Sequence, residues 1–274
     1  FHLGKRKYRC WKKKGHGNMN LHDALVQSCD VYFYTLGHRL GINNLAKYAS
    51  KLGLGELTGI ELKGEKSGLV PSEPWKKKFK NEVWYPGETI SASIGQGYNL
   101  VTPLQSARMI STIASGGLLV RPYLVKKIKD SDGNLIQEFF PEVIKNIEID
   151  SEILKHLKEG LRGVVHEAHG TGHRARLKNV IVAGKTGTAQ VVGMKPSDEI
   201  DPEEEIPYSF RDHAWFVAFA PYENPEVAVS VIIEHGGHGG ATAAPIAGKI
   251  LKTYFSHYPP SKTIELDKDK IEVN

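Results

Sequence analysis

The sequence has no apolar run long enough to cross a membrane. A spanning helix needs about 18 or more consecutive apolar residues, and the 274 residues contain no run of that kind. Two cysteines cannot make a disulfide framework, so they do not indicate a compartment. The net charge of +5 is too small to predict nucleic-acid binding. These absences argue against a membrane span within these residues, a disulfide scaffold and a nucleic-acid-binding protein.

The chain also lacks an initiating methionine, a signal peptide and a lipidation motif. It opens at Phe1-His2-Leu3-Gly4, and we expect it to be a segment of a longer protein. An apolar content of 40% with 24% charged residues is typical of a globular protein, of one large domain or two modest ones. We predict that the lysine runs at 12–14 and 76–78 belong to a solvated face. The acidic stretch 194–206 is predicted to be a mobile loop.

Helical periodicity and capping residues predict most of the helices. Residues 20–40 form either one helix or two that meet at the polar corner Ser28-Cys29-Asp30. Thr102 as N-cap and Pro103 at the first helical position begin a helix that continues to about residue 113. Further helices are predicted over 42–52, 151–165 with Ser151 as cap, and 241–254, whereas 56–100 and 166–176 are predicted to be loop.

Strand signals concentrate in the second half of the chain. Residues 118–125 and 126–140 are mainly strand, and 214–220 with 227–234 make a hairpin around Pro221 and Pro225. A short hairpin loop implies antiparallel pairing. We therefore predict an α+β fold, an α-rich domain around an antiparallel sheet.

The run Lys185-Thr186-Gly187-Thr188 follows the β-type residues 180–182, which are predicted to end a strand at Ala183. It combines an ammonium, two hydroxyls and a glycine that allows close approach. These groups suit a site that grips a carboxylate. A glycine turn between strands without any binding role can have the same sequence. The motif alone therefore does not distinguish a binding site from a structural turn.

Ser28-Cys29-Asp30 is the second candidate. A serine and a carboxylate two residues apart on a turn can both face one cleft. Serine and aspartate are also common helix N-caps, so a purely structural role stays open.

Taken together, the motifs make the chain resemble the transpeptidases among penicillin-binding proteins. Ser28-Cys29-Asp30 matches their Ser-X-Asn/Asp motif, and Lys185-Thr186-Gly187-Thr188 their Lys-Thr/Ser-Gly motif. Other stretches look like the class B penicillin-binding protein 2 of cell elongation: 11–17, 33–34, 94–98 with 102–103, 170–172, 189–191, 211–213 and 219–222. The resemblance covers residues 5 to about 254.

This resemblance implies a penicillin-binding/β-lactamase-type fold, an antiparallel sheet flanked by helices beside an all-helical subdomain. Residues 1–258 would be transpeptidase domain and 259–274 a charged tail. Ser28 would relay a proton and Asp30 would accept hydrogen bonds. Lys185 would supply positive potential, Thr186 and Thr188 would bind a terminal carboxylate, with Gly187 between them, and the Thr188 N–H would form half of an oxyanion hole.

One departure from the family concerns the nucleophile, which sits in a Ser-X-X-Lys motif. No serine in this sequence is followed three residues later by lysine. We expect the nucleophile, and a membrane anchor, to lie upstream of Phe1. A non-catalytic binding module therefore remains an alternative, as does a serine β-lactamase or β-lactam sensor.

The family also implies a setting and partners. The substrate would be peptidoglycan stem peptides, at the periplasmic face of the bacterial inner membrane. β-Lactam antibiotics, a SEDS-family glycosyltransferase and an MreC-type scaffold would be partners. Catalysis would need no cofactor.

Cys10, His16 and Cys29 form a separate pattern, two thiols and an imidazole that suit tetrahedral Zn²⁺. A fourth ligand, an aspartate by expectation, would come from upstream sequence, and the metal would hold the Cys10 loop beneath the Ser28 corner. A buried Cys29, a Cys10–Cys29 disulfide and a surface His16 are alternatives. His235 and His238 are predicted to belong to a glycine-rich turn, and His166, His169 and His173 to the surface.

Overall fold

A three-stranded antiparallel sheet forms the centre of the protein in a computed structural model that describes residues 1–191 and 207–261. The strands are β7 (Ala183–Ala189), β8 (His213–Ala220) and β9 (Val227–Ile233), in the order β7-β8-β9. Lys185 lies opposite Val217 on β8. Among the described residues β7 pairs with β8 alone, so it is an edge strand of this sheet.

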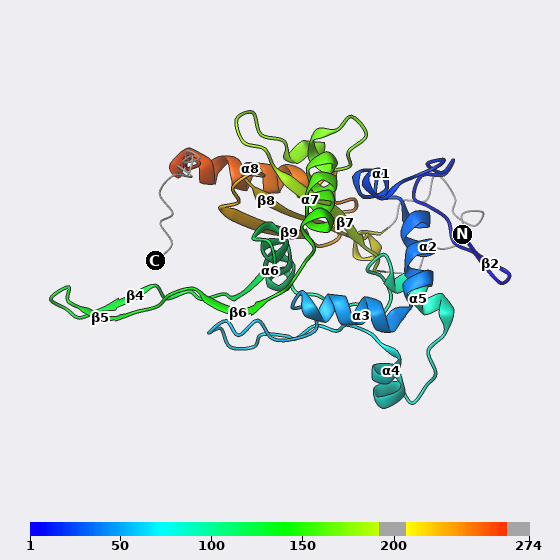
Figure 1. The fold of residues 1–274 in the computed structure, drawn as a ribbon, viewed down its shortest axis with the longest axis horizontal. Helices are drawn as coiled ribbons and strands as arrows, with labels where there is room; N and C mark the ends of the chain where they lie inside the picture. Colours follow the sequence, from blue (N-terminus) through cyan, green and yellow to red (C-terminus); the bar gives the residue numbers. More distant parts are fainter. Residues whose placement is uncertain (192–206, 262–274) are drawn as a thin grey trace, which may run out of the picture.

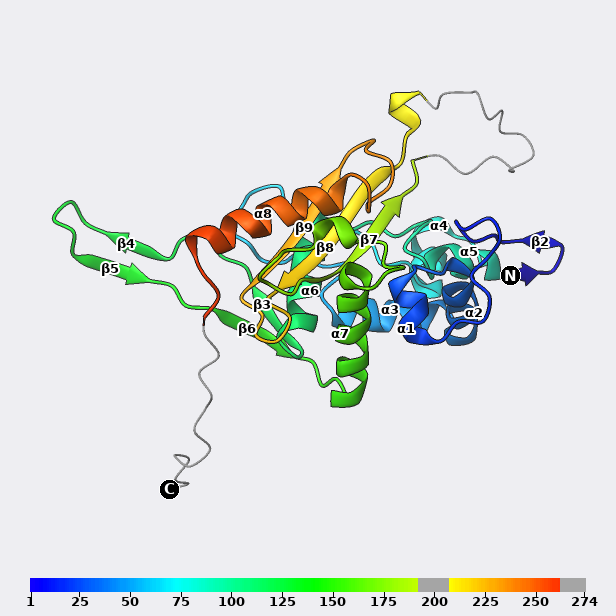
Figure 2. The same ribbon diagram turned by 90° about the horizontal axis from the view of Figure 1, so that it is seen from above.

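Helices cover both faces of this sheet. Helix α8 (Ala243–His257) lies on one face, and α6 (Pro103–Ala114) and α7 (Ser151–His166) lie on the other (Figures 1 and 2). Side chains alternate across the sheet, so Phe216 of β8 packs in the core under α8 while Phe219 packs with α6 and α7. The two cores fix the position of β7.

The remaining helices gather beside the α7 end of the sheet (Figure 2). They are α1 (Leu21–Val26), α2 (Asp30–Leu40), α3 (Ile42–Lys51), α4 (Glu73–Lys80) and α5 (Pro86–Ala92). Helix α1 packs on α7, and α2 packs on α5, where Gly37 leaves room for Ser93. The predicted α+β architecture, a sheet flanked by helices beside a helical region, is confirmed. Of the two alternatives for 20–40, two helices with a corner is correct.

Short two-stranded ribbons complete the fold. They are β1 (His2–Leu3) with β2 (Arg6–Lys7), β3 (Leu118–Arg121) with β6 (Glu142–Asn146), and β4 (Lys127–Lys129) with β5 (Leu135–Glu138). The strands predicted over 118–125 and 126–140 are confirmed in part: β3, β4 and β5 form within these ranges, but residues 122–126 are not strand. The β4–β5 ribbon extends away from the rest of the protein (Figure 1).

The loop predicted over 56–100 is wrong where α4 and α5 form. Ser72 caps α4, with Pro74 in its first turn, and at the start of α5 the Glu88 carboxylate accepts from the Tyr85 N–H at 2.8 Å. Lys76, predicted to be solvated, is only 1% exposed. Its ammonium pairs with Glu88 at 2.5 Å and Glu82 at 3.2 Å, because α4 turns this lysine inward while its neighbours face solvent.

Two further boundaries differ from the predictions. The cap of α7 is Asp150, whose carboxylate accepts from the N–H groups of Glu152 and Ile153, whereas Ser151 is already helical. Strand β7 begins at Ala183, where the branched run was predicted to end, because pairing with β8 rather than β-propensity sets the strand. Residues 166–176, predicted as loop, include a short 3₁₀ helix, His173–Ala175; a second one is Tyr208–Phe210.

Within residues 1–191 and 207–261, no helix is both long enough and apolar enough to cross a bilayer. The predicted helices over 42–52, 103–113 and 241–254 and the hairpin at 214–234 are confirmed as α3, α6, α8 and β8–β9. The acidic stretch 194–206 and most of the tail 259–274 lie outside the described residues.

Candidate active site

The two sequence motifs meet at one point in the fold. The Lys185 ammonium donates a hydrogen bond to Ser28 Oγ at 2.9 Å, although the residues are 157 positions apart. Lys185 reaches this point because β7 lies against α7, which in turn packs on α1, the helix that ends just before Ser28. The fold therefore brings the predicted pair together.

Ser28 occupies the corner between α1 and α2. Its φ is +53°, in the left-handed region that a non-glycine residue adopts at a small energetic cost. Trp11 stabilises the corner from outside: its indole Nε1–H donates to the Ser28 carbonyl at 2.8 Å, and its backbone N–H donates to Asp30 Oδ2 at 2.9 Å. The corner thus holds Ser28 and Asp30 in a defined orientation.

Thr186 lies next to the lysine on β7. The Lys185 ammonium donates to the Thr186 carbonyl at 3.1 Å and lies 3.5 Å from the Thr186 hydroxyl. That hydroxyl also shares a hydrogen bond of 2.9 Å with the Thr171 hydroxyl. An ammonium and a hydroxyl side by side are the donors that a carboxylate needs.

Gly187 is explained by packing within the sheet. A Cβ at Gly187 would lie 3.1 Å from Trp215 Cβ, and a Cβ at Gly239 would lie 2.3 Å from the Gly187 carbonyl oxygen. The glycine-rich turn before α8 therefore lies directly on the backbone of the Lys-Thr-Gly segment. Thr188, the next residue, offers its carbonyl to Gln96 at 2.7 Å.

Lys185 and Asp30 influence each other's pKa. Lys185 is half-buried, and desolvation of its ammonium lowers the pKa of Lys185 to about 8, with Asp30 opposing the shift. Burial raises the pKa of Asp30, and the Trp11 N–H, the Cys10 thiol, Lys185 and His16 act in the opposite direction. A positive group poised near neutral pH beside a hydroxyl is suited to anion binding.

Cys10, His16 and Cys29 also come together, directly behind the Ser28 corner. Their ligand atoms lie within 4.8 Å of one another, and Cys10 Sγ is 3.4 Å from His16 Nδ1. Both cysteines are free, so the disulfide alternative is not what the structure shows. Cys29 is buried, and His16 is half-buried rather than on the surface, with an Nε2 that has no hydrogen-bond partner in the described part of the chain. Two sulfurs and an imidazole in this arrangement fit zinc.

The other histidines do not form a metal site in the described ranges. His235 Nδ1 lies 3.1 Å from the Arg211 carbonyl, and its backbone N–H donates to His213 Nδ1 at 2.9 Å, so it belongs to a structured turn, as predicted. His166, predicted to be a surface residue, is half-buried, and its Nε2 accepts from the Val182 N–H at 3.3 Å.

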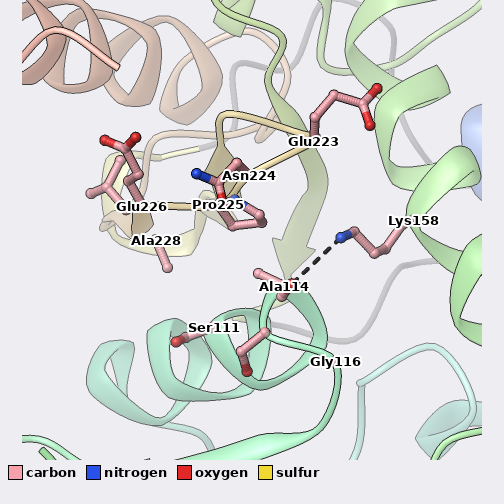
Figure 3. A pocket seen from close by; sticks show the side chains of 11 residues that line it. Ser111, Ala114, Gly116, Lys158, Glu223, Asn224, Pro225, Glu226 and Ala228 are labelled. Carbon is pink, nitrogen blue, oxygen red and sulfur yellow. Dashed lines mark hydrogen bonds between the residues drawn. The ribbon is translucent and has the colours of Figure 1, made fainter. Parts of the chain in front are cut away.

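A pocket of about 450 Å³ lies elsewhere, between the end of α6, Lys158 of α7 and the β8–β9 turn (Figure 3). The Lys158 ammonium donates to the Ala114 carbonyl at 3.4 Å and lies 5.5 Å from the Phe219 ring centroid. Lys158 thereby caps the carboxyl end of α6. None of the predicted site residues lines this pocket.

Three residues at the site had no assigned role from the sequence: Trp11, Gln96 and Thr171. Each lies in a stretch that carried the family resemblance, which is the signal that could have drawn attention to it. Their partners are 15 to 94 residues away in sequence, so only the fold reveals the contacts.

Comparison with known proteins agrees with this geometry. Residues 1–252 match the penicillin binding protein transpeptidase domain. The peptidoglycan D,D-transpeptidase MrdA of Haemophilus influenzae is 36% identical over 259 residues, 93% of this chain and 39% of that protein. The chain therefore spans about two fifths of the length of this curated relative.

Solved structures of penicillin-binding protein 2 are also similar to this chain. Pseudomonas aeruginosa PBP2 in complex with WCK 5153 superposes with a TM-score of 0.79 and 37% identity, over 93% of this chain and 54% of that one. PBP2 of Helicobacter pylori, in a complex with MreC, superposes with a TM-score of 0.75 and 34% identity, over 94% of this chain and 44% of that one.

Proposed function

The chain belongs to the penicillin-binding protein transpeptidase family, and from this membership we propose that it forms part of a peptidoglycan D,D-transpeptidase of cell elongation. The observation that supports the proposal most strongly is the 2.9 Å hydrogen bond from Lys185 to Ser28 Oγ, which unites the two family motifs. The nucleophilic serine and its lysine would come from outside these residues, because no Ser-X-X-Lys occurs in them.

The reaction would proceed through an acyl-enzyme. The serine oxygen forms a bond to the carbonyl carbon between two D-alanines, the C–N bond breaks, and the serine proton leaves on the released D-alanine. An amine of a second stem peptide then forms a C–N bond, the ester C–O bond breaks, and the serine regains a proton. The product is a cross-link.

The residues of this chain would assist at defined atoms. Ser28 Oγ would relay the proton between the nucleophile's lysine and the leaving amine. Lys185 and the hydroxyls of Thr186 and Thr188 would bind the terminal carboxylate, and Gly187 lets the strand pack tightly behind them. The Thr188 N–H would donate to the developing oxyanion, and losing such a donor costs about 3–4 kcal/mol in the barrier. Asp30 would accept from the nucleophile's lysine and the substrate amide.

Replacement of Lys185 tests this assignment in the full-length protein. We expect Lys185→Ala to abolish acylation by benzylpenicillin while the melting temperature changes little, because Lys185 contributes charge to the site rather than apolar packing. Lys178→Ala, at an exposed lysine on the segment before β7, is the matched control and should acylate normally. Normal labelling of Lys185→Ala would refute the role.

Two alternatives predict different products. A serine β-lactamase would release penicilloate repeatedly, whereas a transpeptidase stays acylated. A non-catalytic binding module, favoured by the missing Ser-X-X-Lys, would bind a pentapeptide without releasing D-alanine. Measuring D-alanine release from a pentapeptide together with penicilloate release from benzylpenicillin, both by the full-length protein, separates these cases.

The setting is part of the same proposal. The enzyme would work outside the cytoplasm, at the periplasmic face of the inner membrane, where stem peptides and β-lactams are met. An MreC-type scaffold is the proposed partner, supported by the similarity to a PBP2 solved together with MreC, and a SEDS-family glycosyltransferase would supply the glycan strands.

Cys10, His16 and Cys29 would hold a structural zinc ion. The donor set fits, and the buried, unpaired Nε2 of His16 marks a polar site that is incomplete in the described residues. Zinc would supply no step of the reaction and would hold the Cys10–Trp11 segment against the Ser28 corner. Metal analysis of protein purified without chelator should find about one equivalent of zinc, and Cys10→Ser should remove it and lower the melting temperature. Less than about a tenth of an equivalent in the unsubstituted protein would contradict the proposal.

A further inference from the structure

The outer edge of β7 presents backbone groups to the candidate site. In a strand, the N–H and C=O of alternate residues point to the same edge. The Thr186 carbonyl meets the Lys185 ammonium, and the Thr188 carbonyl and Gln190 N–H both meet Gln96, so the even-numbered residues point away from β8. The Thr188 N–H, the proposed oxyanion donor, therefore points to this same edge.

The side chain of Gln96 behaves here like the peptide group of a neighbouring strand. Its Nε2 donates to the Thr188 carbonyl at 2.7 Å, and its Oε1 accepts from the Gln190 N–H at 3.2 Å. The two bonds lie on either side of Ala189. They fix the backbone of β7 at the point where it would otherwise fray, since β8 pairs with it only as far as Ala189.

Gln96 is itself held by a tight loop after α5. Gly95 and Gly97 have φ values of +79° and +72°, and the Gln96 N–H donates to the Ser91 carbonyl at 3.1 Å. The Asn99 carboxamide donates to the Gln96 carbonyl at 2.9 Å and to that of Ala92 at 3.2 Å. Because the loop is fixed at several points, the Gln96 carboxamide is presented in one orientation.

We propose that Gln96 is a positioning residue for acylation. By clamping the Thr188 carbonyl and Gln190 N–H, it holds Thr188 so that its N–H stays directed at the acyl oxygen. A donor aids catalysis only if it is already in place when charge develops. The inference rests on the proposed function of Thr188, and it assigns Gln96 no contact with the reacting atoms.

The test is acylation of the full-length protein by benzylpenicillin, with the binding step and the acylation step resolved. We expect Gln96→Ala to lower the acylation rate constant by up to about 100-fold, as a small misplacement of a catalytic group does. The dissociation constant of the non-covalent complex should change by less than about threefold, the pattern of a lost transition-state interaction. Gln137→Ala, at an exposed glutamine of β5, is the matched control.

Gln96→Glu provides a readout that a merely structural role would not produce. Near neutral pH its carboxylate keeps the acceptor for Gln190 but faces the Thr188 carbonyl without a donor, so acylation should be slow. Once protonated, below a pH of about 4 to 5, glutamic acid can donate again, and the deficit relative to the unsubstituted protein should shrink.

The outcomes are distinct. Unchanged acylation in Gln96→Ala, or a loss confined to the dissociation constant, would overturn the positioning role, as would a Gln96→Glu deficit that does not depend on pH. If Gln96→Ala fails to fold, the pH dependence of acylation by Gln96→Glu alone tests the positioning role. Failure of the unsubstituted protein to acylate would instead contradict the proposed function.

Discussion

At the scale of single residues, Lys185 combines burial with charge. Its ammonium is removed from water, which disfavours the charged form, yet it lies beside Ser28 Oγ, the Thr186 carbonyl and the field of Asp30. The result is a pKa of about 8 rather than the 10.5 of a free lysine. Lys185 is therefore mostly protonated at neutral pH and titrates just above it.

This pKa predicts a pH dependence of penicillin binding. As the pH rises through about 8, Lys185 loses its proton, so the non-covalent dissociation constant of benzylpenicillin should rise. Lys185→Arg keeps its charge over this range, because a guanidinium titrates above a pH of about 12. An alkaline limb that persists unchanged in Lys185→Arg would show that another group is responsible.

The same pKa sets the sign of a stability effect. The pKa of Lys185 is lower in the folded protein than in the unfolded chain, so between about pH 8 and 10.5 the unfolded chain binds more protons. The contribution of this residue to the free energy of unfolding therefore rises with pH across that window. Lys185→Met should remove that increment, as measured by urea unfolding at pH 8 and pH 10.

At the scale of elements, α6 shows how local sequence and tertiary packing agree. The Thr102 hydroxyl accepts from the Gln105 N–H at 3.2 Å, and Gln105 Oε1 accepts from the Thr102 N–H at 2.9 Å. Gln105 is fully buried, and its Nε2 also donates to the Glu56 carbonyl at 2.7 Å and the Ser67 carbonyl at 2.8 Å. Gln105 thus links the start of α6 to the two loops that contain Glu56 and Ser67.

We expect Thr102→Ala to lower the free energy of unfolding by about 1 kcal/mol, the usual cost of losing an N-cap. Thr102→Ser keeps the hydroxyl and should lose much less. Denaturant unfolding of both variants checks this. Equal losses in the two variants would mean that the Thr102 methyl group, rather than the cap, supplies the stability.

The same elements show where sequence reasoning succeeds. Helices α3, α6 and α8 and the β8–β9 hairpin follow from periodicity, caps and turn residues that lie within each segment. Lys76 shows where it fails, because its burial depends on Glu82, Glu88 and the packing of α4, none of which a run of lysines reveals. Strand β7 is a similar case, because β8 supplies its pairing from distant sequence.

At the scale of the whole molecule, the fold places three distant segments around one site: the corner at Ser28, the loop at Gln96 and strand β7. The motifs predicted which residues to examine, and the structure shows that Ser28 and Lys185 are in contact. The contacts of Gln96 with Thr188 and Gln190 could not be predicted from periodicity, because a glutamine side chain that pairs with a strand edge leaves no periodic signal; only the resemblance over 94–98 pointed to this loop. The three possible zinc ligands were predicted and do lie together, while their metal remains a proposal.

By the proposed function, Ser28, Lys185 and the β7 edge serve a serine acyl-enzyme. The most direct measurement is intact-mass spectrometry, under denaturing conditions, of the full-length protein before and after incubation with benzylpenicillin. We expect a stable mass increase of one penicillin per chain, absent from Lys185→Ala and present in Lys178→Ala. No adduct on the unsubstituted, folded protein would contradict the proposed function.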